Sequence, residues 1–167
     1  MASVLETRSD CSRCAALCCI AYPSEEMPGF SAAKQAGQAC PKLGSDGLCT
    51  IYTRRAEEGF AGCIAFECFG AGQHVVQHLF ADRDWREDRA VLGAMVDAFL
   101  AMRPVSDLNF LAKRIMDSAQ DRKVRAEAAA LADRLRTIAA SHAGLHDTAE
   151  IGAVERDLRA LYLRHGR

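Results

Sequence analysis

The chain has 167 residues, of which 50% are hydrophobic and 26% are charged, and this composition excludes a disordered or collagen-like chain. The 21 basic and 22 acidic residues leave a formal net charge of −1, so nothing points to nucleic acid or to an anionic membrane as a partner. No apolar stretch reaches the ~20 residues of a membrane-spanning helix. The acidic Glu6 and Asp10 precede the short apolar run 15–22, where a signal peptide would be basic, so we expect a cytoplasmic protein.

All eight cysteines lie between Cys11 and Cys68. In a reducing compartment such a set favours metal or redox chemistry over disulfides. A C-x2-C pair directs two thiolates at one ion, and Cys18 returns to the same side if the stretch after Cys14 is helical. The adjacent Cys18 and Cys19 would diverge by about 100° on a helix, so one of them would serve a second site or pack in the core. The candidate metal ligands are Cys11, Cys14, Cys18, Cys19, Cys40, Cys49, Cys63 and Cys68.

The cofactor expected from this set is an iron–sulfur cluster or zinc, because thiolates select soft metals and spacing alone does not separate the two. A metal would also hold together a Gly-rich segment with few regular elements. The basic residues expected to offset the thiolate charge are Arg13, Lys42, Arg54 and Arg55.

Three other interpretations stay open for the cysteines. Each free thiol could be a small buried hydrophobe. Zinc could be purely structural in an interaction or regulatory module, or the thiols could form a redox sensor. No catalytic constellation emerges, because a Cys–His hydrolase would leave the other seven thiols unexplained.

The ordered series carries a resemblance. Its parts are Cys11-x2-Cys14-x3-Cys18-Cys19, Cys40-Pro41, Cys49-Thr-Ile-Tyr52, Cys63 and Cys68. Over about residues 10–72 this series resembles the CxxCxxCC (YkgJ-like) family of zinc- or iron-chelating domains, which implies chelation rather than a reaction. It is closer still to the N-terminal cysteine-rich region of actinobacterial pentapeptide-repeat proteins. The shared segments are Gly59-Phe-Ala-Gly-Cys63, Cys68-Phe-Gly-Ala-Gly-Gln-His74 and Asp84-Trp85-Arg86. One residue is extra before Cys18, and the chain contains no pentapeptide repeat.

Two histidine pairs need an interpretation. His74 and His78 share one face if their segment is helical, and they could complete a Cys3His site or carry protons beside a cluster. The favoured interpretation is a capping or partly exposed histidine pair near the interface between the two halves of the chain. His142 and His146 flank Gly144, which should end a helix between them, so no role is expected for them.

The composition changes near Asp82, which predicts a loop-rich cysteine-cluster domain over 1–83 and a four-helix domain over 84–167. The expected helices are 84–102, which Pro104 would end, 106–118, 121–141, and one that a capping box of Asp147 and Glu150 opens. The fold class is thus mainly α, with an antiparallel helical bundle that serves as scaffold or as a docking surface for a protein partner. The expected core stripes are Val91, Leu92, Met95, Val96, Phe99 and Leu100, then Leu108, Leu111, Ile115 and Met116, then Val124, Ala128, Leu131, Leu135 and Ile138, and finally Ile151, Val154, Leu158 and Leu161.

Overall fold

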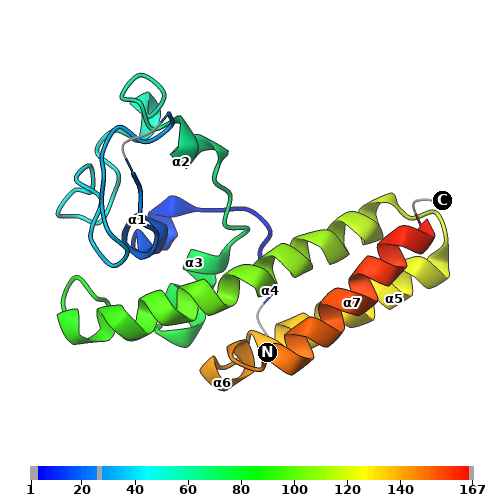
Figure 1. Cartoon of the computed structure of the whole chain (residues 1–167). Helices are drawn as coiled ribbons and strands as arrows, with labels where there is room; N and C mark the ends of the chain where they lie inside the picture. Colours follow the sequence, from blue (N-terminus) through cyan, green and yellow to red (C-terminus); the bar gives the residue numbers. More distant parts are fainter. Residues whose placement is uncertain (1–3, 26–27, 166–167) are drawn as a thin grey trace.

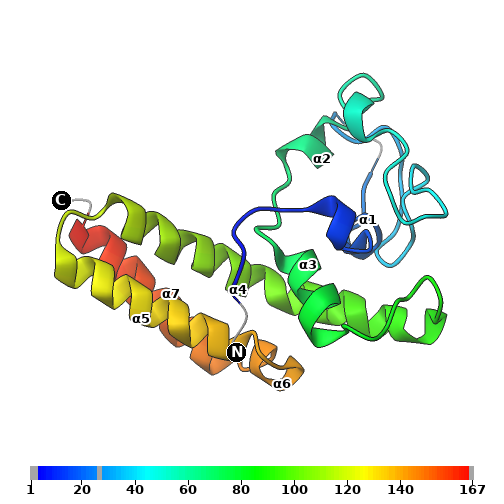
Figure 2. The same ribbon diagram turned by 180° about the vertical axis from the view of Figure 1, so that it is seen from behind.

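The long helix α4 (Leu92–Ser118) is the frame of the molecule in the computed structural model, which describes residues 4–25 and 28–165. Its 27 residues span about 40 Å. The cysteine-rich part lies over one end of α4, and α5 and α7 run along the other end (Figure 1). The view from behind shows the same division (Figure 2). The fold is mainly α, as the sequence predicts, and none of the helices in the described residues is long and apolar enough to cross a membrane.

The cysteine-rich part is built from short elements joined by loops. In chain order they are a 3-10 turn at Cys11–Arg13, α1 (Leu17–Ala21), a 3-10 turn at Tyr52–Arg54, α2 (Ala61–Ala65), α3 (Ala71–His74) and a π-helical turn at Val75–Leu79. Extended pairing within the described residues is limited to two isolated antiparallel bridges, Ser24 with Lys34 and Leu43 with Cys49. Side-chain and loop contacts, rather than a sheet or long helices, therefore stabilise the cysteine-rich part.

The first two helices expected in the second half are one continuous helix, so the expected stop at Pro104 is wrong. The start at residue 84 is also wrong, because a 3-10 turn at Arg89–Val91 precedes α4 and the Asp88 side chain caps that turn. Proline inside a helix costs about 3 kcal/mol. Met102 and Val105, on either side of the exposed Pro104, are both buried, and this apolar packing outweighs the cost.

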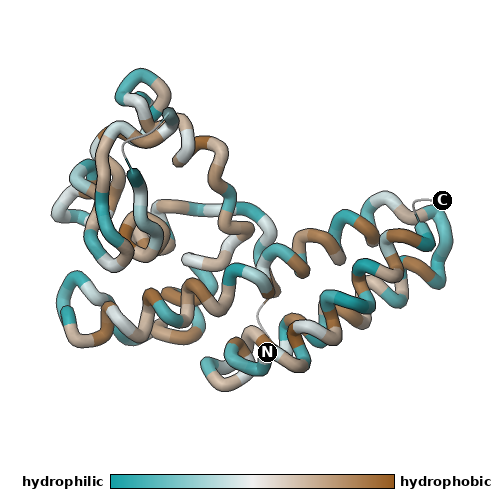
Figure 3. Tube along the Cα trace, viewed as in Figure 1, coloured by the Kyte–Doolittle hydropathy of each residue, from teal (hydrophilic) through white to brown (hydrophobic). Residues whose placement is uncertain are grey.

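Three long helices and one short turn thus replace the expected four-helix domain. After α4 come α5 (Arg122–Ile138), the one-turn α6 (His142–Leu145) and α7 (Thr148–His165). The Asp147 side chain accepts the backbone N–H of Glu150 at 3.0 Å, as the expected cap requires. Hydrophobic segments recur along α4, α5 and α7 (Figure 3). The predicted stripe residues that are buried are Val91, Met95, Phe99, Ile115, Ala128, Leu131, Leu135, Ile138, Ile151, Val154, Leu158 and Leu161.

One hydrophobic core joins the two parts of the chain. Leu17 and Ile20 of α1 belong to the same buried cluster as Met95 and Phe99 of α4. A hydrogen bond also joins the two parts: Nε1–H of Trp85 donates to the carbonyl oxygen of Ala15 at 2.8 Å. The division into domains at 1–83 and 84–167 stays a prediction, and a shared core crosses it.

Candidate metal centre

A left-handed turn shapes the first cysteine motif. Ala15 and Ala16 have φ values of 48° and 57°, which cost roughly 1 kcal/mol each in residues that carry a Cβ. Both are buried, and this turn aims the backbone N–H groups of Ala16 and Leu17 at the thiol of Cys14, where they act to lower its pKa. Helix α1 begins only at Leu17, so the condition of a helical path from Cys14 to Cys18 is not met. The turn, rather than a shared helix face, brings the thiols together.

The segment before Cys11 is tied to α3 and to Cys68. The buried side chain of Gln73 accepts the backbone N–H of Asp10 at 2.7 Å. The Ser9 hydroxyl oxygen accepts the backbone N–H of Cys68 at 3.0 Å and lies 2.9 Å from its Sγ. Gly72 lets α3 approach the motif, because a Cβ there would lie 2.9 Å from Cys14 Cβ. These contacts place three distant stretches of chain around one group of thiols.

Four thiols form what we call the first set: Cys11, Cys14, Cys18 and Cys68. Burial raises the pKa of Cys11, and the thiolates of Cys68 and then of Cys19, from the neighbouring set, raise it further. Burial also raises the pKa of Cys14 to about 12, with contributions from Cys11 and Cys68. A hydrogen bond with Cys19 and then burial raise the pKa of Cys18, and the charges of Cys14 and Cys11 add to this. These mutual effects place the four thiols in one neighbourhood of the structure.

The other four thiols form the second set: Cys19, Cys40, Cys49 and Cys63. The backbone N–H of Cys40 donates to the carbonyl of Cys19 at 3.0 Å, and the bridge from Leu43 carries Cys49 to the same place. Burial raises the pKa of Cys40, and the thiolates of Cys19 and Cys49 raise it further. Burial likewise raises the pKa of Cys63, followed by the charges of the other three members. The second set thus collects one thiol from each of four separate segments.

The two sets meet at Cys18 and Cys19, whose Sγ atoms lie 4.0 Å apart. Both residues lie on α1, so their Cβ atoms diverge as expected, and the side-chain rotamers bring the two sulfurs near each other at the border between the sets. The hydrogen bond from Cys18 lowers the pKa of Cys19, and the charges of Lys34 and Arg55 lower it further. Cys19 is therefore the thiol best prepared to ionise in this pair.

Lys34 is a cation that the sequence analysis missed. Its Nζ donates to the backbone carbonyls of Gln38 at 3.0 Å, Ile20 at 3.3 Å and Tyr22. Burial lowers the pKa of Lys34, and the thiolates of Cys40, Cys19, Cys18 and Cys63 act in the opposite direction. The antiparallel bridge with Ser24 fixes the backbone of Lys34, and that long-range pairing was not visible as a sequence signal.

Of the four basic residues expected to offset thiolate charge, Arg55 does so. It acts on Cys11, Cys19 and Cys63, and its Nη1 donates to the carbonyl of Cys63 at 3.3 Å. The other three make ion pairs with carboxylates instead: Arg13 with Glu6 and Asp10, and Lys42 and Arg54 with Glu58.

The sulfurs of the eight cysteines are gathered in one region rather than packed against one another. Among the described residues, which include all eight cysteines, no three sulfurs lie within 4.8 Å of one another.

His74 lies between the two halves of the chain, as the sequence analysis favoured, but it is buried rather than capping or partly exposed. Its Nε2 lies 2.9 Å from the carbonyl oxygen of Ala139 at the end of α5. Burial lowers the pKa of His74, so the neutral ring is favoured. His78 is exposed, and its ring centroid lies 4.9 Å from that of His74.

No role is expected for His142 and His146 from the sequence, and in the structure both lie against Asp97 of α4. Gly144 does not end a helix between them, because it lies within α6 and its φ is not positive. Asp97, His142 and His146 offer three ligand atoms within 4.8 Å of one another. The four-residue spacing of the histidines was the available signal, but nothing in the sequence paired them with Asp97.

Comparison with known proteins gives one relative and no family assignment. No family model matches the chain, and no solved structure matches it. The chain is 38% identical over 100 residues to the uncharacterized protein YybG of Bacillus subtilis (strain 168), an alignment that covers 60% of this chain and 36% of YybG. The chain thus matches about a third of that relative's length, and the relative's name assigns no activity.

Proposed function

We propose that the protein binds metal through its eight cysteines, as an iron–sulfur centre or as zinc, and that it belongs to the CxxCxxCC (YkgJ-like) family that its motif resembles. The observation that carries the proposal is the convergence of eight free thiols, from segments as distant as Cys11 and Cys68, into two adjoining sets of four. Four thiolates are a complete ligand set for one zinc ion or one iron–sulfur cluster.

The surroundings of the thiols support this proposal. Several thiolates in a partly buried region repel one another, and Lys34 and Arg55 place positive charge beside them. Backbone N–H groups point at Cys14 and at Cys40, and such hydrogen bonds stabilise thiolate ligands. Eight thiols that served only as buried hydrophobes would need neither feature.

Thiolates bind both iron–sulfur clusters and zinc, and the two differ in what they would supply. A cluster would supply one-electron redox chemistry, whereas zinc would supply structure alone at sites with four thiolates.

The test is metal and sulfide analysis with a visible spectrum of anaerobically purified protein. An iron–sulfur protein is brown and contains acid-labile sulfide, whereas a zinc protein is colourless. Cys14→Ser probes the first set and Cys63→Ser the second. If each set holds its own centre, either change removes about half of the metal and the double variant removes nearly all of it. If all eight thiols hold one centre, either change alone removes most of it.

Ser12→Ala is the matched control, because Ser12 lies within the same motif and its side chain bonds only to Asp10 in the described structure. Its metal content should equal that of the parent. Parent protein without stoichiometric metal, or metal that both cysteine variants retain, would contradict the proposal.

A second candidate, a thiol redox sensor, is favoured by the pair Cys18 and Cys19. The sulfurs lie 4.0 Å apart and the pKa of Cys19 is lowered, which suits attack by its thiolate on an oxidant. The Cys19 thiolate would attack a peroxide, which forms a sulfenic acid and releases water, and the thiol of Cys40 from the neighbouring segment would then displace a second water to form a disulfide. Mass analysis of metal-free protein after peroxide treatment tests this, since a disulfide between Cys19 and Cys40 joins two tryptic peptides and lowers their combined mass by two hydrogens.

A further inference from the structure

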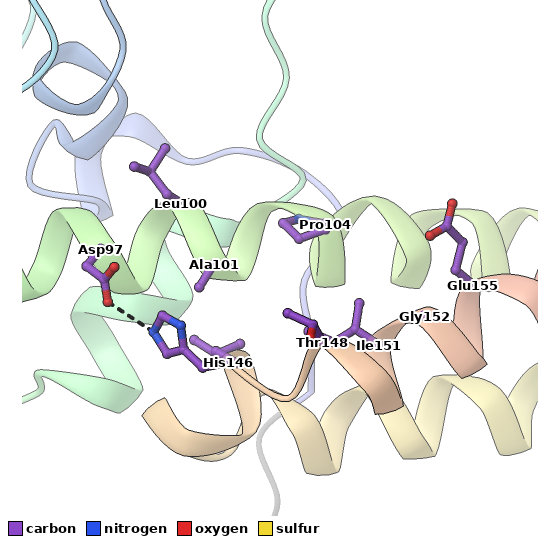
Figure 4. A pocket seen from close by; sticks show the side chains of 10 residues that line it. Asp97, Leu100, Ala101, Pro104, His146, Thr148, Ile151, Gly152 and Glu155 are labelled. Atoms are coloured by element: carbon purple, nitrogen blue, oxygen red, sulfur yellow. Dashed lines mark hydrogen bonds and ion pairs between the residues drawn. The ribbon is translucent and has the colours of Figure 1, made fainter.

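Outside the cysteine-rich part, three side chains from two elements meet at one point. The carboxylate oxygen Oδ2 of Asp97 lies 3.2 Å from Nε2 of His142 and 3.0 Å from Nε2 of His146. The two imidazole rings lie side by side, with centroids 4.6 Å apart. Figure 4 shows the contact between Asp97 on α4 and His146. Both histidines thus direct the same nitrogen at the same carboxylate.

The turn that holds the histidines is built tightly. Ser141 caps α6, and its hydroxyl accepts the backbone N–H of Gly144 at 3.1 Å. Gly144 has to be glycine, because a Cβ there would collide with the carbonyl oxygen of Ile138. One helical turn then places His142 and His146 on the same face, four residues apart.

We propose that Asp97, His142 and His146 bind a divalent transition-metal ion of the zinc class, at a site separate from the cysteines. Two imidazole nitrogens and one carboxylate oxygen are a donor set that zinc uses at sites with open coordination positions. The side chains are about half exposed, at 55%, 50% and 46%, so an ion can reach them without opening the fold. The ion would replace the direct contacts that Asp97 makes with the two rings.

The open positions of such an ion would border a groove. A cavity of about 390 Å³ begins at Asp97 and His146 and runs between α4 and α7 to Glu155. Leu100, Pro104 and Ile151 lie along it (Figure 4). An ion at this site would lie at the end of an apolar groove and keep open coordination positions. A closed structural site would instead need a fourth protein ligand.

The other histidine pair serves as an internal comparison. His74 and His78 have the same four-residue spacing and a similar ring separation, but Nε2 of the buried His74 is engaged by the carbonyl of Ala139. No group of three metal-ligating side chains within the described residues includes them. Spacing alone thus predicts two pairs, and the presence of Asp97 distinguishes the one that can bind.

The experiment is anaerobic titration of the full-length protein, with the metal content it has as isolated, first with Zn2+ by calorimetry and then with Co2+ by absorption. We expect one equivalent of zinc above the isolated content. Cobalt at this site should show only weak visible bands, whereas cobalt on thiolates shows intense near-ultraviolet charge transfer. His146→Ala and Asp97→Asn should each weaken the added equivalent at least about tenfold. His78→Ala, the matched control, should leave it unchanged.

Acid should release the added equivalent, because protons compete for both imidazole nitrogens. Gly144→Ala gives an independent variant: it keeps all three ligands but displaces the turn, and it should also weaken binding while far-ultraviolet circular dichroism shows that the helices remain. Absence of an added equivalent would overturn the proposal, as would an equivalent with thiolate charge transfer or one that His146→Ala leaves intact. Because the readout excludes thiolate-bound metal, failure here leaves the proposed cysteine function untouched.

Discussion

Trp85→Phe should destabilise the contact that joins the helices to the first cysteine motif. Trp85 is the single tryptophan of the chain, it is 7% exposed, and its Nε1–H donates to the carbonyl of Ala15. Phenylalanine keeps most of the buried ring but leaves that carbonyl without its partner, which costs roughly 1–3 kcal/mol. The smaller ring adds about 1 kcal/mol for the space it leaves. We expect the free energy of unfolding to fall by about 2–4 kcal/mol in all.

For a chain of this length, 1 kcal/mol shifts the melting temperature by about 2–4 °C, so the expected fall is roughly 4–16 °C. Denaturant unfolding followed by far-ultraviolet circular dichroism measures the free energy directly. Because Ala15 lies in the left-handed turn beside Cys14, the variant should also lose cysteine-bound metal to a chelator faster than the parent.

Tyr162→Phe is the control, since Tyr162 is 54% exposed on α7 and removal of its hydroxyl should change the free energy of unfolding by less than about 0.5 kcal/mol. If Trp85→Phe unfolds like this control and keeps its metal equally well, the Trp85 contact does not couple the two parts and the reasoning fails.

Three further outcomes are expected. Leu135→Asp puts an unpaired charge at a side chain with 0% exposure, and denaturant unfolding should show a loss of about 4 kcal/mol or more, whereas an unchanged midpoint would mean that the α5 stripe is not core. In metal-free protein near neutral pH, iodoacetamide should label Cys19 before Cys14, because the pKa of Cys19 is lowered and that of Cys14 is raised to about 12. Peptide mass analysis can follow the two labelling rates. Lys34→Met should slow the labelling of Cys19, and equal rates in the parent and this variant would contradict the charge argument. Removal of metal should expose the loops between residues 23 and 59 to limited proteolysis, while α1 and α3 stay protected by their packing on α4. A first cut near residues 82–85 would show instead that the two parts fold separately.

The sequence was sufficient to predict the helical stripes, because apolar residues at helical spacing must bury one face. Leu131, Leu135 and Leu158 are all buried as that spacing requires. Local signals were less reliable at element ends. Proline predicts the end of a helix, but buried residues on both sides of Pro104 keep α4 continuous. Their packing involves distant parts of the chain, which a rule based on neighbouring residues does not consider.

For the cysteine region, the sequence predicted which residues gather but not how. Ala15 and Ala16 adopt the left-handed conformation, which glycine and asparagine favour and alanine does not. The path from Cys14 to Cys18 could therefore not be derived from residue preferences. Lys34 and Asp97 illustrate the same limit at long range. Each lies near its partners through loop or helix packing, and one sequence without an alignment records no such pairing.

The two candidate centres lie on opposite sides of the same stretch of α4. Met95 and Phe99 are buried in the core that α1 shares, while Asp97, two residues from each, is exposed and faces the α6 turn. Residues two apart on a helix point about 200° from each other, so one turn of α4 supports both sites without a shared ligand.

An ion that binds only the folded chain stabilises it by about 2.7 kcal/mol at 100 times its Kd. Zinc at the histidine site should therefore raise the melting temperature of the whole protein. A helix with one conformation does not transmit a change from one site to the other. The rate at which a chelator removes cysteine-bound metal from the native protein should consequently be the same with and without zinc at Asp97, and a changed rate would reveal a second conformation of α4.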